Sequence, residues 1–388
     1  MKKFKLVLLL LIPIINSCIK NSKSIKPFEI TIDNRNISNF DYVDKMVDSF
    51  DIVPLQTNSS SIVSDWADDL IVEKKRIFVA DFSLNKISIF DERGKFINKI
   101  LPSGDGPGEY TGFQSMIFND FNRELELFSG FQRKLLIYNE NGIFLREEPQ
   151  NLLFQSKKYL TQDICVYYCH VPNSEILNQE KSYKIVYQNK SSNKVQYYCS
   201  ISDFELNLGP LFITSHFNKI KDSLVWFEPF NNNIKTITKN GVTDRYFLKF
   251  TKNQIPTDYW DKRNKYKMML DAAQNQNFPF LSDFFFENNR YIVFIYDYNK
   301  INHLFIYDKM LKKPIFNANQ PLINKWKLPL TMPRSVNSES LLFFIPASDF
   351  KNLIKYHIDK KFLPKQFLFI DEKLKIEDNP IILKIFLK

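Results

Sequence analysis

The chain has 388 residues and carries 53 Lys and Arg against 43 Asp and Glu, which gives a net charge of +10 at pH 7. An excess of positive charge can indicate a nucleic-acid partner, but here the lysines are scattered and no block of five like charges occurs. We therefore expect no nucleic-acid partner for this protein.

The N-terminus has the pattern of an export signal. Residues 1–5 are rich in lysine, and residues 6–15 form an apolar run that is too short to cross a bilayer as a helix, which takes ~20 residues. The sequence INSC at 15–18 resembles the lipobox of bacterial lipoproteins, which implies cleavage before Cys18 and acylation of that residue. The pattern predicts a signal peptide over residues 1–17, with an ordinary secreted protein as the alternative.

Residues 18–27 follow as a short polar tether that contains three lysines. In lipoproteins of Bacteroidetes-type bacteria, an acidic stretch after the lipidated cysteine tends to direct the protein to the cell surface. Since the tether here is basic, the resemblance favours an outer-membrane lipoprotein on the periplasmic side.

The rest of the chain is built from repeats, which decide the fold. Residues 70–100 contain four short apolar runs separated by turn-forming residues, and residues 116–146 repeat this pattern. The hairpin turns DERG and NENG end at Gly94 and Gly142, which are 48 residues apart. A further hairpin turn is predicted at Asn240-Gly241, because both residue types tolerate positive φ.

Four-stranded units that recur every ~40–50 residues are typical of β-propeller blades. We therefore predict an all-β fold over residues 28–388, a six-bladed β-propeller with four-stranded antiparallel blades. A solenoid, the alternative, would need capping units that the sequence does not show. The six predicted blades cover residues 67–101, 113–149, 155–199, 212–250, 281–317 and 328–388.

Two strand-like segments near the start of the predicted propeller have no blade of their own. We expect residues 28–32 and 50–55 to complete the last blade and so close the ring. Within that last blade, strands are predicted at 341–345, 367–370 and 381–386.

Between the fourth and fifth blades, residues 258–275 have apolar side chains at helical spacing. The pattern predicts a short helical insertion. Its apolar stripe packs on its own domain or, as the less favoured alternative, binds a partner.

The residues IFVADFSLNKISIFDERGKFINKI at 77–100, followed by GDGPGEY at 104–110, resemble the six-bladed, NHL-like β-propeller lipoproteins of Bacteroidetes. The likeness extends over the mature chain and is sharpest over residues 50–145. It implies a propeller fold and a location in the cell envelope, without a known activity. One departure is Leu101-Pro102, where that family usually has a further glycine, so the entry to the loop differs.

The glycine-rich loop is the candidate ligand site. The chain has nine glycines, and four of them lie within residues 104–112. In a propeller, this connection between blades crosses one face beside the central channel, where backbone amides could meet a ligand. The candidate residues are Gly104, Asp105, Gly106, Gly108, Glu109 and Tyr110.

A structural role is the favoured alternative for the loop, in which the glycines permit a tight crossing between blades and Glu109 caps loop amides. A phosphate-binding P-loop is not favoured, because no GK[ST] sequence follows and the next segment, FQSMIF, has the pattern of a strand.

Cysteines and histidines give little support for a metal site. Cys165 and Cys169 are four residues apart on a predicted strand, about 13 Å, which is too far for a mutual disulfide. Either could pair with Cys199 or stay a buried thiol. The histidines lack metal-ligand spacing, so we expect no metal and no cofactor; they are His170, His216, His303 and His357.

The sequence therefore predicts a membrane-anchored binding or scaffold module of the envelope, whose ligand is a glycan, a peptide or an envelope protein. No catalytic residue is assigned. The alternative is a propeller-type hydrolase or lyase with its site at the mouth of the central channel.

Overall fold

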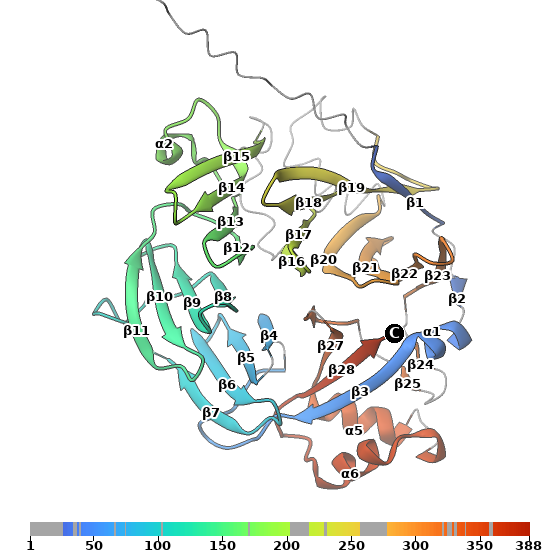
Figure 1. The fold of residues 1–388 in the computed structure, drawn as a ribbon. Helices are drawn as coiled ribbons and strands as arrows, with labels where there is room; N and C mark the ends of the chain where they lie inside the picture. The colour runs from blue at the N-terminus through green and yellow to red at the C-terminus, as the bar shows by residue number, and fades with distance from the viewer. Residues whose placement is uncertain are drawn as a thin grey trace, which may run out of the picture.

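The structure is a computed structural model, and it describes residues 26–33, 37–38, 40–65, 67–73, 75–101, 104–169, 171–201, 217–228, 231–256, 278–319, 322–323, 328–329, 332–337, 339–356 and 360–388. Within these ranges, six sheets of four or five strands surround a common centre (Figure 1). The chain is a six-bladed β-propeller, which confirms the predicted fold class.

Neighbouring strands within a blade pair antiparallel, except β1 at the edge of blade 4, and in blades 1 to 3 the strands follow one another in chain order from the centre outwards. Blade 1 contains β4 (Asp69–Glu73), β5 (Arg76–Asp81), β6 (Lys86–Asp91) and β7 (Phe96–Ile100). Blade 2 contains β8 (Ser115–Asn119), β9 (Glu124–Ser129), β10 (Lys134–Asn139) and β11 (Phe144–Pro149). Blade 3 contains β12 (Ser156–Tyr159), β13 (Ile164–Tyr168), β14 (Tyr183–Asn189) and β15 (Lys194–Ser200), with the short helix α2 (Ser174–Leu177).

Blades 4 to 6 each include a strand from the N-terminal segment. Blade 4 contains β16 (Phe217–Ile220), β17 (Ser223–Trp226), β18 (Asn233–Thr238), β19 (Gly241–Phe250) and β1 (Phe28–Ile32). Blade 5 contains β20 (Phe280–Glu287), β21 (Tyr291–Tyr298), β22 (Ile301–Asp308), β23 (Lys313–Ala318) and β2 (Ile37–Ser38). Blade 6 contains β26 (Ser335–Val336), β27 (Ser340–Ile345), β28 (Ile381–Leu387) and β3 (Val47–Pro54).

The predicted hairpin turns of blades 1 and 2 are confirmed. Gly94 has φ of +82° and Gly142 has φ of +77°, a backbone region that glycine adopts without strain. In each turn the glycine N–H donates a hydrogen bond to the carbonyl oxygen of the residue three positions earlier, Asp91 at 3.0 Å and Asn139 at 2.9 Å. The sequence repeat therefore fixes these turns locally.

The core consists of apolar layers between neighbouring blades. One such layer joins blades 1 and 2, where the buried rings of Phe78 and Phe118 pack with centroids 5.3 Å apart. The middle strands of a blade are buried on both faces because each face meets an adjacent blade. Burial of both faces requires the closed ring.

Three interfaces between blades also contain a buried glutamate. Each glutamate accepts hydrogen bonds from a cationic side chain and from a tyrosine of the adjoining blade. The groups are Glu126 with Lys157 (2.6 Å) and Tyr159 (2.5 Å), Glu228 with Lys184 (2.9 Å) and Tyr168 (3.2 Å), and Glu287 with Arg245 (2.7 Å) and Tyr246 (2.8 Å). Paired in this way, the charges can be buried at the interfaces.

The ring closes through β3, as predicted for residues 50–55. β3 pairs antiparallel with β28 along the whole strand, from Pro54 opposite Ile381 to Val47 opposite Leu387. Residues near the two ends of the chain thus form one sheet, and blade 6 is completed by the N-terminal segment.

The prediction that residues 28–32 also belong to the last blade is wrong. β1 pairs parallel with β19 on the outer edge of blade 4, with Phe28 opposite Tyr246 and Ile32 opposite Phe250. Ile30 and Ile32 are fully buried between blades 4 and 5. The physical reason is that β19 offers a free outer edge beside an apolar surface that matches these two side chains.

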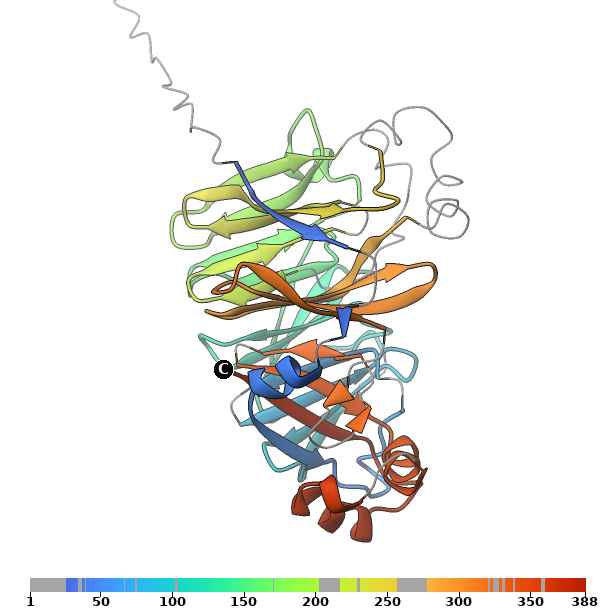
Figure 2. The same ribbon diagram turned by 90° about the vertical axis from the view of Figure 1, so that its right-hand side faces the viewer.

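The prediction of a strand at 367–370 is also wrong. These residues lie in helix α6 (Lys365–Lys373), which with α5 (Ala347–Tyr356) and the 3₁₀ helix η3 (Lys360–Phe362) forms an insertion between β27 and β28. Figures 1 and 2 show the insertion at one end of the molecule, outside blade 6. Phe367 is buried against Phe50 and Phe350, whereas Phe369 is 56% exposed, so the short apolar run has one buried helix face.

Two smaller elements, a pair of short strands and a helix, belong to none of the six blades. The strands β24 (Leu322–Ile323) and β25 (Leu328–Pro329) pair with each other, and helix α1 (Phe40–Met46) lies between β2 and β3.

The predicted helix at 258–275 lies outside the described residues, as do the predicted signal peptide and most of the tether. Among the helices that the structure describes, none combines the length and apolar character needed to span a bilayer.

The position of β1 leads to a test. Ile30→Ala removes a side chain that is fully buried between blades 4 and 5, so we expect the free energy of unfolding to fall by about 2–4 kcal/mol. Thr31→Ala, on the exposed side of the same strand, is the matched control and should change it by less than about 0.5 kcal/mol. Denaturant unfolding measures both variants. Equal stability of the Ile30→Ala variant and the unmodified protein would contradict the docking of β1.

Candidate functional site

A cavity of about 280 Å³ occupies the centre of the ring, and all six blades contribute to its wall. Its volume lies just below the ~300–1,000 Å³ range that is usual for small-molecule sites. The lining residues are Glu73, Asp120, Lys158, Phe217, Asn218, Lys219, Ile220, Lys221, Phe285, Phe286, Glu287, Val336 and Asn337.

The cavity lies where the innermost strands end. Glu73 is the last residue of β4, Glu287 the last of β20 and Val336 the last of β26, while Asp120 and Lys221 directly follow β8 and β16. The innermost strands therefore run in the same sense, and their C-terminal ends bring polar residues of different blades to one place.

An ion pair crosses the channel. Lys219 Nζ of blade 4 lies 2.6 Å from Asp120 Oδ2 of blade 2, so the pair bridges the inner edge of blade 3. The same ammonium group lies 4.4 Å from the centroid of the Phe121 ring. This contact fixes both side chains at the cavity wall.

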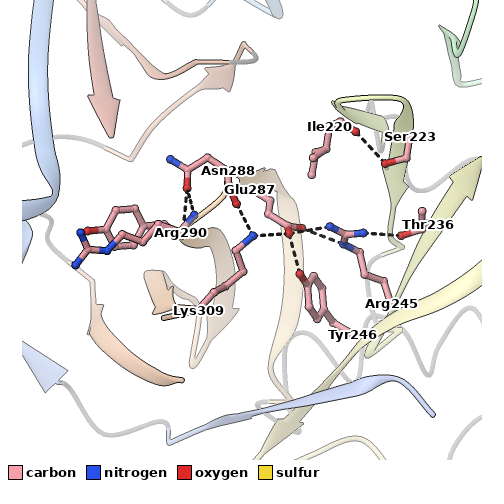
Figure 3. Close-up of polar contacts among 10 residues, drawn as sticks. Ile220, Ser223, Thr236, Arg245, Tyr246, Glu287, Asn288, Arg290 and Lys309 are labelled. Atoms are coloured by element: carbon pink, nitrogen blue, oxygen red, sulfur yellow. Dashed lines mark hydrogen bonds and ion pairs between the residues drawn. The ribbon is translucent and has the colours of Figure 1, made fainter. Parts of the chain in front are cut away.

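The Glu287 carboxylate is also fully engaged (Figure 3). Its Oε1 accepts hydrogen bonds from Arg245 Nη2 at 2.7 Å, Tyr246 Oη at 2.8 Å and Lys309 Nζ at 2.9 Å, and its Oε2 accepts one from Arg245 Nε at 3.0 Å. Although burial acts to raise it, the pKa of Glu287 is lowered by the hydrogen bonds from Arg245 and Lys309. Glu287 therefore belongs to the rigid wall and has little capacity left for a ligand.

Three charged side chains of the cavity remain available. In the part of the chain that the structure describes, the side chains of Glu73, Lys158 and Lys221 make no hydrogen bond or ion pair. Burial raises the pKa of the Glu73 carboxyl above its usual value, and the charge of Lys158 opposes that shift. The site thus presents one carboxyl group and two ammonium groups whose hydrogen-bonding capacity is unused.

The glycine-rich loop joins β7 of blade 1 to β8 of blade 2, as expected. Gly104 and Gly108 have φ of +150° and +75°, so both use backbone conformations that favour glycine, whereas Gly106 does not. Gly106 N–H donates to Glu109 Oε2 at 3.0 Å, and the Asp105 carboxylate accepts a hydrogen bond from Gln132 at 2.7 Å.

Further contacts bind the loop to both blades. Tyr110 is buried and its hydroxyl donates to the carbonyl oxygen of Asn85 at 2.7 Å, while Gly108 N–H donates to Glu147 Oε2 at 3.2 Å. Burial raises the pKa of Tyr110 above its usual range. These are the contacts of a junction between blades, with Glu109 capping a loop amide.

The loop and the cavity lie at opposite ends of β8. The loop precedes Ser115, while the cavity residue Asp120 follows Asn119, and the five residues of this strand span roughly 16 Å. None of the six candidate loop residues lines the cavity. A role of the loop in ligand binding stays a prediction.

Sequence reasoning missed the charged residues of the cavity. Each lies at or beside the end of an innermost strand, as in LIVE at 70–73 and FNKIK at 217–221. Aligning the repeats and comparing the residues where each first strand ends would have given this signal.

The cysteines at 165, 169 and 199 and the described histidine pack among apolar or aromatic side chains of the blades. Cys165 and Cys169 are buried free thiols, and Cys199 is a partly buried free thiol in a different apolar cluster. His303 is buried, stacks on Tyr296 with centroids 5.1 Å apart, and has a pKa lowered by burial. The other three histidines lie outside the described residues, and within those residues no group of His, Cys, Asp and Glu has the arrangement of a metal site.

Comparison with known proteins supports the fold. Residues 27–386 match the family described as a domain of unknown function, DUF4934. A Bacteroides fragilis protein described as a candidate exported protein has a similar structure, with a TM-score of 0.69, 18% identity and coverage of 93% of this chain and 99% of that chain.

A member of the DUF4221 family from Bacteroides vulgatus is similar with a TM-score of 0.51 and 12% identity, over 88% of this chain and 97% of that chain. At these identities the two likenesses show the fold alone. No curated protein matches the sequence.

The loop geometry leads to a stability test. Gly108→Ala forces a non-glycine residue to φ of +75° and places its Cβ 3.2 Å from the Phe144 ring, so we expect a loss of about 1–2 kcal/mol in the free energy of unfolding. Gly112→Ala is the control, because that position has ordinary space and no positive φ. If denaturant titration gave the two variants the same midpoint, the loop would not be conformationally demanding.

Proposed function

Because the chain belongs to the DUF4934 family, a family of unknown function, we propose a function from its channel: it is a lipid-anchored propeller of the cell envelope that binds a small ligand in the central cavity. The observation that carries this proposal is the presence of Glu73, Lys158 and Lys221 in one cavity, with polar groups that the fold itself does not use. Glu73 and Lys158 are partly buried, whereas Lys221 is exposed at the cavity. A partly buried charge without a partner costs free energy, so a ligand that binds Glu73 and Lys158 would offset that cost.

Export and anchoring are supported by the sequence at 15–18 and by the likeness to a Bacteroides protein described as a candidate exported protein. In this proposal Cys18 carries the lipid, and residues 18–27 connect it to β1 on the outer edge of blade 4. The protein is an NHL-like outer-membrane lipoprotein on the periplasmic side, and its ligand is a glycan, a peptide or part of an envelope protein.

The alternative of a hydrolase or lyase has less support. The described residues that line the cavity include lysines and carboxylates but no histidine, and they form no pair of nucleophile and base at hydrogen-bonding distance. Binding accounts for the cavity with fewer assumptions.

Cavity filling tests the binding site. Glycans and peptides are screened by thermal shift against the soluble protein that lacks residues 1–18. Glu73→Trp fills the cavity without removing a contact of the fold, so we expect it to abolish the stabilisation that a bound ligand gives, about 2.7 kcal/mol at a hundredfold excess over Kd. The control Lys313→Trp places the same side chain at the exposed first residue of β23, away from the cavity, and should leave binding unchanged. A ligand that stabilises the Glu73→Trp variant as well as the unmodified protein would place the site elsewhere.

The anchor is tested separately. Cys18→Ser removes the acylated side chain, so we expect the protein to move from the membrane fraction to the soluble envelope fraction of the cells. Detergent partitioning of the unmodified protein and the variant measures this change. Retention of the variant in the membrane fraction would contradict lipid anchoring at Cys18.

A further inference from the structure

We propose that the central cavity selects a small anionic ligand, whose carboxylate or phosphate group binds Lys158 and Lys221. This inference rests on the proposed function, because it takes the cavity to be the ligand site, and it adds the charge class of the ligand.

The first argument is the balance of charge around the cavity. The described anionic groups in the wall are Glu73, Asp120 and Glu287. The described cationic groups that line the wall or bind those carboxylates are Lys158, Lys219, Lys221, Arg245 and Lys309. The three lysines of the wall balance its three carboxylates, and the excess of positive charge comes from Arg245 and Lys309, which bind Glu287 from outside the wall. The field of these charges favours an anion over a cation in the cavity.

The second argument is which of these charges are already used. Lys219 is paired with Asp120, and Glu287 is paired with Arg245 and Lys309. Lys158 and Lys221 remain, against the single carboxyl group of Glu73. An anion would therefore meet more unused partners in this cavity than a cation would.

The protein itself contains an example of the contact. Lys219 Nζ holds the carboxylate of Asp120 at 2.6 Å in the same cavity, which shows that a carboxylate can lie within reach of a lysine here. A lysine ammonium offers three donors without a fixed orientation, which suits either the oxygens of a carboxylate or those of a phosphate.

Glu73 defines the other end of the ligand. Its carboxylate is an acceptor, so it favours a ligand with hydroxyl or amide donors away from the anionic group. A purely cationic ligand bound to Glu73 would lie near the ammonium group of Lys158 and would be repelled by it. The charge of Lys158 already interacts with the Glu73 carboxyl group. The chemistry that fits is an acidic group joined to hydrogen-bond donors within a molecule of about monosaccharide size.

A matched set of probes tests the charge class. Glucuronate, glucose 6-phosphate, glucose and glucosamine share one pyranose ring and differ in charge. We expect glucuronate, glucose 6-phosphate or both to bind at least about tenfold more tightly than glucose and glucosamine in calorimetric titrations. Comparison of the two anions distinguishes a carboxylate ligand from a phosphate ligand, and added salt should weaken the binding of either.

Variants connect the binding to the two lysines. Lys158→Gln and Lys221→Gln should each weaken binding of the anionic probe by about tenfold, while Lys313→Gln, at the exposed first residue of β23, should leave it unchanged. Both cavity lysines lack partners within the described residues, so the variants should keep the unfolding midpoint of the unmodified protein.

Several outcomes would overturn the inference: neither anion binds, glucose or glucosamine binds as tightly as the anions, or the double variant Lys158→Gln, Lys221→Gln binds the anion as the unmodified protein does. If a neutral or cationic ligand from the screen is blocked by Glu73→Trp while both anions fail, the charge class is wrong and the proposed function stands. If the anions bind the Glu73→Trp variant unchanged, the cavity is not the site and both proposals fail.

Discussion

The pairing of β3 with β28 is the constraint on which the rest of the structure depends. It joins residues 47–54 to residues 381–387 and gives blade 6 its outermost strand. Without it, blade 6 would lose its outermost strand, and the apolar layer against blade 1, to which Leu342 and Ile382 also contribute, would lose the buried side chain of Val53. The segment that follows β3 also contacts blade 1, where Gln56 N–H donates a hydrogen bond to the carbonyl oxygen of Gly94 at 2.8 Å. A Cβ at Gly94 would lie 2.1 Å from the carbonyl oxygen of Pro54, so the first hairpin turn must be glycine for the end of β3 to lie beside it.

The N-terminal segment does more than close the ring. It runs along the outer edges of three successive blades, with β1 on blade 4, β2 on blade 5 and β3 in blade 6. An uncovered outer strand exposes unpaired N–H and C=O groups that can pair with other chains. The same segment that follows the proposed lipid anchor therefore protects half of the propeller rim, and any force on the tether acts first on β1.

The buried glutamates at the blade interfaces differ from the unpaired charged groups of the cavity, because each of these glutamates has partners within the fold. Glu126, Glu228 and Glu287 each receive a cation and a tyrosine hydroxyl from the adjoining blade, so the fold accounts for their charge. Glu73 ends the innermost strand of blade 1 as Glu287 ends that of blade 5, but Glu73 has no such partner among the described residues. The contrast separates side chains that hold blades together from those available to a ligand.

The sequence by itself determined the blade count, the hairpin turns at Gly94 and Gly142, and the N-terminal strand that closes the ring, because turn residues and strand periodicity act over short distances. Only the tertiary structure decided that residues 28–32 join blade 4 and that the apolar run at 367–370 is helical, since both depend on which surface an apolar side chain finds. The cavity, too, belongs to the tertiary structure: Lys219 and Asp120 are 99 residues apart and meet across the channel only after the ring has formed. No local pattern records such a meeting, because it is set by the curvature that six packed sheets impose on one another.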